Sequence, residues 1–432
     1  MEFNQLIQDA FNSLTQEQSE DTFFPIRQKA YENFQRQGIP TSKHEEWKYT
    51  RINSIVNNAN AAFNFATPFK VTGIENIPAL PFTQTALQLV FVDGVFYEEL
   101  SMLNDTVEVC SMQQASVRYP DYIKKHAGHS SRYIKDGMQA LNTAFAGNGL
   151  FVLVPKNTVL DAPIYIHHIT RSVANQLFVQ PRSLVVVEEN AQVQLVEMYS
   201  NEGTQECFTN QVTEIAVYDQ ARMEYYKLQN QASHCHQVGT THIQQVGKCF
   251  THCVTITLSG GTVRNNLNLV LEAPHNEGHM YGLYLLDGQT HADNHTIVDN
   301  LAPDCFSNEF YKGIMDGKSN GVFNGKIFVR QIAQKTNAYQ SNKNVLLSDT
   351  AQVNTKPQLE IFADDVKCSH GCTIGRLDDE AMFYLKARGI GDKKAKALLL
   401  HAFAEEIVEQ VKPEELKKYI ENLINERLEF GE

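Results

Sequence analysis

The sequence lacks the features that mark several large classes of protein. Eight cysteines in 432 residues, with no Cys-x-x-Cys pair, are too few for a disulfide scaffold and indicate reduced thiols. Lysine and arginine (37) are outnumbered by aspartate and glutamate (50), and the net charge of -13 argues against binding to nucleic acid or anionic membranes. No apolar run reaches the ~20 residues that span a bilayer, and the first residues show no secretory signal. We therefore expect a cytoplasmic protein without membrane insertion.

The signals of a self-contained enzyme are also missing. Gly321 to Ile327 resembles a phosphate-binding loop, but it has three residues between its glycines, and Ile327 stands where the motif needs Ser or Thr. We interpret this segment as a turn between strands and expect no nucleotide site. The sequence has no Gly-x-Ser-x-Gly nucleophile elbow and no His-Glu-x-x-His zinc motif. The chain is therefore expected not to be an enzyme.

The N-terminal part of the chain has helical patterns. Apolar residues on one stripe predict an amphipathic helix over residues 3–14, and a second helix is predicted from Pro25 to Phe34. Trp47, the only tryptophan, is interpreted as an anchor between these helices and the main body. Residues 51–85 are expected to be irregular.

After Asp378 the sequence predicts a hairpin of two helices. The second helix begins near Pro413, because proline is favoured in the first turn of a helix. The first helix carries an apolar stripe that either packs on the body or binds a partner. The stripe comprises Ala395, Leu398, Leu399, Ala402, Phe403, Ile407 and Val411.

The middle of the chain, from about residue 150 to 365, is a series of short β-rich runs separated by turn residues. A helical interlude is expected before it, near residues 119–145. A long series of strands without helices fits a β-solenoid, and a sandwich of this size stays open. Asparagines such as Asn265, Asn294 and Asn324 are expected at solenoid corners, where their amides can stack.

These patterns predict a mainly β protein with three parts. The first is a helical domain over residues 1–85. The second is a β core over residues 86–376, which includes the helical interlude. The third is a helical domain over residues 377–432.

Cys368, His370 and Cys372 are the most concentrated candidate ligands, and they lie two residues apart. On a strand they would share one face, whereas on a loop they could converge on one atom. Thiolate and imidazole suit zinc, copper or an iron-sulfur centre rather than magnesium or calcium. Three ligands do not fill a tetrahedral site, so a site shared with another chain is one interpretation. The other is that the cysteines are small buried hydrophobic residues.

Other cysteines and histidines are grouped less specifically. Cys249 and Cys253 would share a strand face, as would His291 and His295, and His234 to His236 form a third group. Each spacing could hold a metal. Each is also expected by chance in a β region rich in these residues, and we interpret all three groups as structural.

Several segments share their sequence pattern with one known family. They are Glu45–Trp47, Ala140–Phe145, Phe323–Lys326, Gln334–Gln340, Lys356–Gly371 and Leu377–Ile390. These segments closely resemble the SufB/SufD family of iron-sulfur cluster assembly proteins, and the resemblance covers most of the chain. Within the family, the Cys-Ser-His-Gly segment at 368–371, the Glu-Glu-Trp-Lys-Tyr-Thr segment at 45–50 and the length resemble SufD rather than SufB.

The resemblance implies a right-handed parallel β-helix between N-terminal and C-terminal helical domains. It also implies a non-catalytic scaffold in a complex of one SufB, one SufD and two copies of SufC, the ATPase of the system. The C-terminal helices would dock SufC, with Leu398, Leu399, Phe403 and Ile407 as the expected contacts.

In that complex Cys368 and His370 would bind a transient iron-sulfur cluster shared with SufB. Cys372 stands where the family commonly has alanine, which makes it a candidate additional ligand. Reduced flavin is proposed to visit related complexes, and a homodimer of the isolated chain would be compatible with the same interface.

Two alternatives stay open at this point. The chain could be a SufB-like scaffold that accepts sulfur on Cys249 or Cys253. A β-helix polysaccharide lyase is the more remote alternative, and the missing secretion signal and catalytic groups argue against it.

Overall fold

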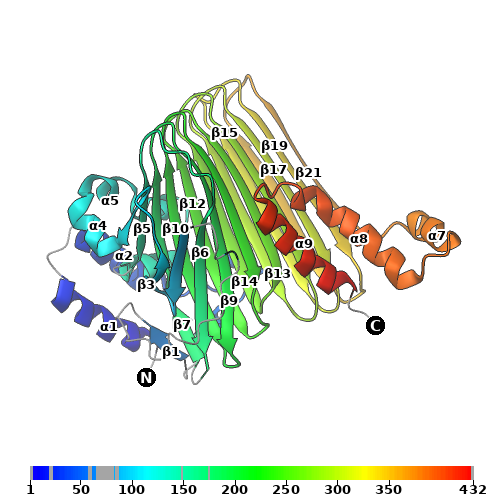
Figure 1. Ribbon diagram of the computed structural model, residues 1–432, viewed down its shortest axis with the longest axis horizontal. Coiled ribbons are helices and arrows are strands. Elements are labelled where there is room, and N and C mark those ends of the chain that lie inside the picture. Colours follow the sequence, from blue (N-terminus) through cyan, green and yellow to red (C-terminus); the bar gives the residue numbers. More distant parts are fainter. Residues whose placement is uncertain are drawn as a thin grey trace.

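The computed structural model describes residues 3–18, 23–56, 61–64, 82, 87–146, 149–173 and 176–429. Most of these residues form a parallel β-helix of about eight turns with helices at both ends (Figure 1). The fold class predicted for the chain is therefore confirmed. The irregular region predicted over residues 51–85 lies largely outside the described residues. No helix in the described ranges combines the length and apolar character needed to cross a membrane.

Each turn of the β-helix contributes one strand to each of two parallel sheets, named sheet A and sheet B. Sheet A has the order β20-β18-β16-β14-β12-β10-β8-β5-β4, with β1 and β7 beside it, and sheet B has the order β21-β19-β17-β15-β13-β11-β9-β6-β2-β3. The strands of sheet A are β1 (Ala61–Asn64), β4 (Glu108–Ser111), β5 (Leu150–Val154), β7 (Gln176–Val179), β8 (Arg182–Val187), β10 (Cys207–Val217), β12 (Cys235–Gln245), β14 (Thr262–Leu271), β16 (His291–Asn300), β18 (Asn320–Val329) and β20 (Gln352–Ile361). Those of sheet B are β2 (Leu87–Val92), β3 (Val95–Met102), β6 (Ile164–Ser172), β9 (Gln192–Gly203), β11 (Arg222–Asn230), β13 (Phe250–Ser259), β15 (Glu277–Leu286), β17 (Phe306–Met315), β19 (Asn337–Leu346) and β21 (Lys367–Gly375).

Inward-facing side chains fill the space between the two sheets. Since alternate residues of a strand point to opposite faces, every second residue joins this core. The parallel register places each inward residue beside its partner on the next turn, so the core is built of columns. One column of sheet B contains Leu195, Tyr225, Cys253, Met280, Glu309, Gln340 and His370.

Two details predicted from the sequence are wrong. Gly321 to Ile327 lies inside β18 and is not a turn. A Cβ at Gly321 would lie 3.0 Å from Tyr284, and one at Gly325 would lie 2.3 Å from Gln340 Nε2, so these glycines make room for large inward side chains. The asparagines lie within strands rather than at corners, and Asn265 donates to Asn294 there at 3.2 Å.

Helices cover the outer face of sheet A near its first turns (Figure 1). The helical interlude predicted near 119–145 is present and begins earlier, at Met112. Trp47 is 2% exposed, its indole N–H donates to Asp136 at 3.1 Å, and the guanidinium of Arg264 lies 3.9 Å from its ring centre. The predicted anchor is therefore confirmed. The elements are α1 (Phe3–Gln18), α2 (Phe24–Gln37), η1 (Glu45–Trp47), α3 (Asn53–Val56), α4 (Met112–Arg118), α5 (Pro120–His126), η3 (His129–Arg132) and α6 (Gly137–Ala144).

The predicted C-terminal hairpin is confirmed as α8 (Asp392–Val408) and α9 (Glu414–Glu429), which pack on the outer face of sheet B. A further helix, α7 (Asp379–Ala387), precedes them, buries none of its residues and stands away from the β-helix in Figure 1. The predicted apolar stripe of α8 is partly wrong. Leu398 and Ala402 are exposed, and the buried face instead consists of Ala395, Leu400, Ala404, Ile407 and Val408.

Candidate functional site

The first turns of the β-helix are covered, whereas its last turn is open. Antiparallel pairs with β3 and β4 close the early edges of the two sheets. At the other end, β20 and β21 each pair with only one strand among the described residues. Every residue of β21 is exposed or half-buried, although Ala338, Gln340 and Asn342 beneath it on β19 are at most 3% exposed. The inward-facing side chains of the last turn therefore reach solvent.

The three candidate ligands lie on this open strand. Cys368, His370 and Cys372 are in register with the buried inward residues of β19, so they share one face of β21. Residues two apart on a strand are ~7 Å apart and residues four apart ~13 Å, so neighbours can reach one ion but the two cysteines cannot. Within the described ranges, no three His, Cys, Asp or Glu side chains are grouped to hold a metal ion. If this edge binds a metal ion, further ligands would have to come from another molecule.

The two candidate cysteines differ in their surroundings. Cys368 is half-buried and contacts the core between the sheets, while Cys372 is exposed. Burial raises the pKa of the Cys368 thiol, although the backbone N–H of Ala338 works in the opposite direction. The thiol therefore holds its proton near neutral pH. Metal binding would have to displace that proton, which makes binding at Cys368 sensitive to acid.

The alternative sulfur acceptors are enclosed in the core. Cys249 is 6% exposed and Cys253 is fully buried, and burial raises the pKa of both thiols far above the ordinary value. Because the thiolate is the reactive form, neither residue is suited to receive sulfur from a donor protein. The observed burial argues against the sulfur-accepting alternative.

The histidine groups have structural partners. His291 bonds to Thr50 at 2.8 Å, and His295 lies 3.0 Å from Asp293 and 3.5 Å from Glu46. These contacts hold the segment around Trp47 against sheet A. In the third group, the backbone N–H of Thr262 donates to His236 at 3.0 Å. The interpretation of these histidines as structural agrees with this geometry.

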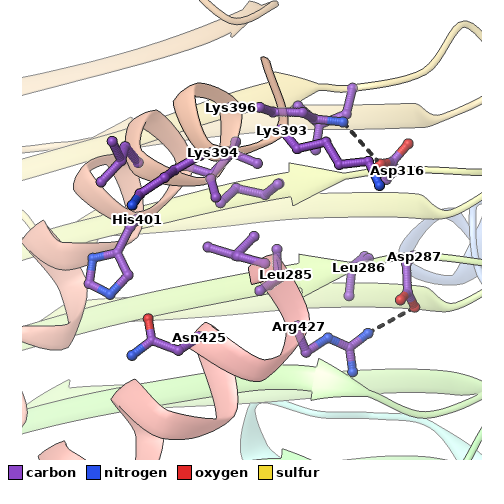
Figure 2. A pocket seen from close by; sticks show the side chains of 16 residues that line it. Leu285, Leu286, Asp287, Asp316, Lys393, Lys394, Lys396, His401, Asn425 and Arg427 are labelled. Atoms are coloured by element: carbon purple, nitrogen blue, oxygen red, sulfur yellow. Dashed lines mark hydrogen bonds and ion pairs between the residues drawn. The ribbon is translucent and has the colours of Figure 1, made fainter. Parts of the chain in front are cut away.

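A groove between α8, α9 and the ends of β15 and β17 was not predicted from the sequence (Figure 2). Its volume is about 930 Å³, and leucines such as Leu285, Leu398 and Leu428 line it. Two carboxylates in the lining are paired, Asp316 with Lys396 at 3.5 Å and Asp287 with Arg427 at 2.8 Å. Lys393 and Lys394 also line the groove and make no ion pair with any residue that the structure describes. The groove is thus apolar with an excess of positive charge at its rim. A signal for it in the sequence is the run of lysines followed by leucines over residues 393–400.

The four expected SufC contacts have different environments on α8. Leu398 is 45% exposed and lines the groove, and Leu399 is half-buried. Phe403 is half-buried, and Lys312 Nζ lies 4.3 Å from its ring centre and donates to its carbonyl at 2.8 Å. Ile407 is fully buried against sheet B. Leu398 is therefore the most accessible of the four to a docking protein, while Ile407 fixes the hairpin to the β-helix.

Comparison with known proteins identifies relatives over nearly the whole chain. Residues 168–403 match the family model "SUF system FeS cluster assembly, SufBD core domain", and residues 1–166 match "SufBD protein N-terminal region". An iron-sulfur cluster assembly SufBD family protein of Synechocystis is 33% identical, covering 86% of this chain and 84% of the relative. The iron-sulfur cluster assembly protein SufD of Escherichia coli is 30% identical, covering 94% and 93%. SufD of Bacillus subtilis is 26% identical, covering 73% and 72%.

Proposed function

This chain belongs to the SufBD family of iron-sulfur cluster assembly proteins, and we propose that it acts as a SufD-like scaffold subunit. In this role it has no catalytic activity of its own. It pairs with SufB through the open end of its β-helix and docks the ATPase SufC on its C-terminal helices. A cytoplasmic location follows from the proposed role.

The observation that carries this proposal is the open last turn with Cys368 and His370 on it. An exposed sheet edge presents unpaired N–H and C=O groups and is a template for pairing with another chain. The apolar side chains Val353 and Leu359 of β20 are only partly buried there. A second β-helix that continues the sheets would cover both the backbone groups and the apolar surface. SufB, which has the same family fold, is such a partner.

Iron and sulfide are the cargo that would be bound at this junction. His370 supplies a neutral imidazole and Cys368 a thiolate, and SufB supplies the remaining ligands. Cys372 lies too far from Cys368 to bind the same ion, so it serves as an additional ligand only for a second atom of the cluster. Reduced flavin, if it acts in the complex, enters as a separate electron donor.

SufC docking is proposed for the surface formed by α7, the groove and the exposed side of α8. Phe383 and Tyr384 of α7 are 74% and 56% exposed, and Leu398 of α8 is 45% exposed. These residues are on a domain joined directly to β21 by residues 376–378. A movement of the helices caused by ATP binding to SufC would therefore be transmitted to the strand that carries Cys368 and His370. We propose the stoichiometry of one SufB, this chain and two SufC.

The cluster role can be tested by anaerobic co-expression with SufB and SufC. The His370→Ala and Cys368→Ser variants should assemble the complex but lose the absorbance of the bound cluster. The matched control is Thr373→Ala, an exposed side chain on the opposite face of the same strand. A His370→Ala complex with the wild-type amount of cluster would refute the ligand role.

The docking surface can be tested in the same system. Leu398→Glu should release SufC and retain SufB, because a charge would replace an apolar contact in the groove. Asn422→Glu places the same charge on an exposed position of α9 outside the groove and should retain both partners. Equal retention of SufC by the two variants would place its contact elsewhere.

A further inference from the structure

Two polar side chains lie in the column directly beneath His370. The register pairs His370 with Gln340 of β19, and Gln340 with Glu309 of β17. Gln340 Nε2 donates to Glu309 Oε2 at 2.6 Å. Gln340 is 3% exposed and Glu309 1%, so both lie inside the β-helix while His370 reaches solvent above them. The interior beneath the candidate ligand is therefore polar and ordered.

The carbonyl oxygen of the Gln340 side chain has no donor. Gln340 Oε1 is buried and makes no hydrogen bond to any described residue. A buried acceptor without a partner destabilises the folded state, so an unused acceptor needs an explanation. His370 is the register neighbour of Gln340 on the outer side, and adjacent strands are ~4.8 Å apart. A side-chain hydrogen bond between the two residues is within reach.

One end of the Gln340 amide is held by Glu309. The NH₂ group of Gln340 donates to Glu309 Oε2, which leaves the amide oxygen free. Gly325 of β18 faces this amide, and a Cβ there would lie 2.3 Å from Gln340 Nε2. The glycine thus leaves the space in which the amide is held.

In the neighbouring column, the side-chain amide of Asn342 forms hydrogen bonds through both its NH₂ group and its oxygen. Asn342, beneath Cys372, donates to the Tyr284 hydroxyl at 3.0 Å and to the Tyr311 carbonyl at 3.2 Å. Its side-chain oxygen accepts from Asn344 at 2.6 Å. Asn342 therefore uses both ends of its amide within its own strand and the turns before it, whereas Gln340 keeps an acceptor available for the strand above it.

We propose that Gln340, oriented by Glu309, is a positioning residue for His370. Its Oε1 accepts the imidazole N–H that faces the interior, so the other ring nitrogen presents its lone pair outward. Histidines that bind metals are commonly oriented by such a hydrogen bond from the second ring nitrogen. This inference rests on the proposed function, because it concerns His370 as a ligand of the nascent cluster.

The hydrogen bond can be tested on the full chain by histidine-selective ¹⁵N labelling and long-range ¹H–¹⁵N spectra. The imidazole signals that are missing from the spectrum of His370→Ala belong to His370. The wild type should show one imidazole tautomer at neutral pH, and Gln340→Met should show a mixture because the acceptor is gone. Gln358→Met makes the same change on β20, opposite Lys326, and should leave the His370 signals unchanged. An unchanged His370 tautomer in a folded Gln340→Met protein would overturn the inference.

Two further variants keep the test valid if Gln340→Met unfolds. The double substitution Glu309→Gln/Gln340→Glu restores an acceptor beneath His370 with the two groups exchanged, and it should restore the single tautomer. Gly325→Ala displaces the amide without changing Gln340 and should again give the mixture. A double variant that keeps the mixture while folded would count against the proposed hydrogen bond.

The consequence for cluster binding is measured in the complex with SufB and SufC. Loss of such an orienting partner typically weakens metal binding ~10–100-fold, so Gln340→Met should reduce cluster occupancy by a comparable factor at limiting iron. If His370→Ala itself left the cluster intact, the proposed function would fail, whereas the spectra would still decide whether Gln340 orients His370. The two failures are thus separable.

Discussion

The Glu309→Gln substitution should change how the stability of the protein depends on pH. Burial raises the pKa of Glu309 to about 7, and the nearby Thr296 hydroxyl and the hydrogen bond from Gln340 offset only part of this effect. Between pH 4.5 and 7 the unfolded chain ionises this carboxyl while the folded chain holds the proton. Stability contributed by this group is therefore full below pH 4.5 and is lost as the pH rises through 7. The shift from 4.5 to about 7 corresponds to a loss of about 3 kcal/mol.

A variant without the Glu309 carboxyl should not lose this stability as the pH rises. We expect the free energy of unfolding of Glu309→Gln, relative to the wild type, to increase by up to about 3 kcal/mol between pH 5 and pH 8. The measurement is urea unfolding followed by circular dichroism at several pH values in this range. Glu360→Gln, an exposed glutamate on β20, is the control and should follow the wild type. If Glu309→Gln showed the same pH dependence as the wild type, the buried carboxyl would not titrate in this range.

Three other expectations test the packing of the two helical regions. Ile407→Ala removes a fully buried side chain and should destabilise the C-terminal hairpin by about 2–5 kcal/mol, seen as earlier proteolysis of residues 392–429, whereas Leu398→Ala should not. Trp47→Ala should cost about 3–5 kcal/mol in urea unfolding, because the ring is enclosed between Asp136 and Arg264; a loss below 1 kcal/mol would contradict the anchor. Burial lowers the pKa of His242 to about 3 and that of its partner His129 to about 4, so their contribution to stability is present above pH 6.5 and is lost as the pH falls toward 4. His242→Asn should therefore show a shallower acid-induced decrease in the urea midpoint, and an equally steep decrease would show that this pair is not responsible.

The repeated strands could be predicted from the sequence, but their side-chain roles could not. The β-rich runs and the absence of helical periods over the middle of the chain fit a solenoid but leave a sandwich open, and the family resemblance favours the β-helix. Glycine is common in turns, and the sequence predicts a turn at Gly321 to Ile327. In the structure the role of its two glycines depends on Tyr284 and Gln340, which belong to other turns and to the opposite sheet. Contacts across the core between residues of different turns cannot be predicted from the sequence around each glycine.

For the candidate site, the ligand residues could be predicted from the sequence, whereas the side chains beneath them could not. The alternation of Cys368, His370 and Cys372 is compatible with a shared face on a strand or with convergence on a loop, and the structure places all three on a strand. The polar column beneath His370 could not be found, because Gln340 and Glu309 precede it by one and two turns of the β-helix. On α8, apolar residues lie on all sides from Ala397 to Leu400, so periodicity could not distinguish exposed Leu398 from buried Leu400. Only the position of sheet B decides which of them is covered.

The two open edges differ in the backbone groups that they offer a partner. In a parallel ladder, alternate residues direct their N–H groups to opposite sides. Gln352 of β20 donates toward the preceding turn, so the odd-numbered residues of β20 direct their N–H groups outward. Pro357 belongs to this outward set and has no N–H. On β21, Lys367 donates toward the preceding turn, so the even-numbered residues, His370 among them, direct their N–H groups outward, and none of them is proline.

If this chain pairs with SufB as proposed, sheet B is the edge to which a strand of SufB can add without losing a central hydrogen bond. Ile374→Pro removes one outward N–H from β21 and should weaken the pairing with SufB roughly tenfold, since a lost hydrogen bond of about 1 kcal/mol is joined by the clash of the ring. Thr355→Pro makes the same change on the edge that Pro357 already interrupts, and it should pair nearly as the wild type does. The assay is a titration of SufB against each chain by light scattering. If both prolines weakened pairing equally, the partner strand would not add at β21, and the ligands on β21 would have to meet SufB through side chains alone.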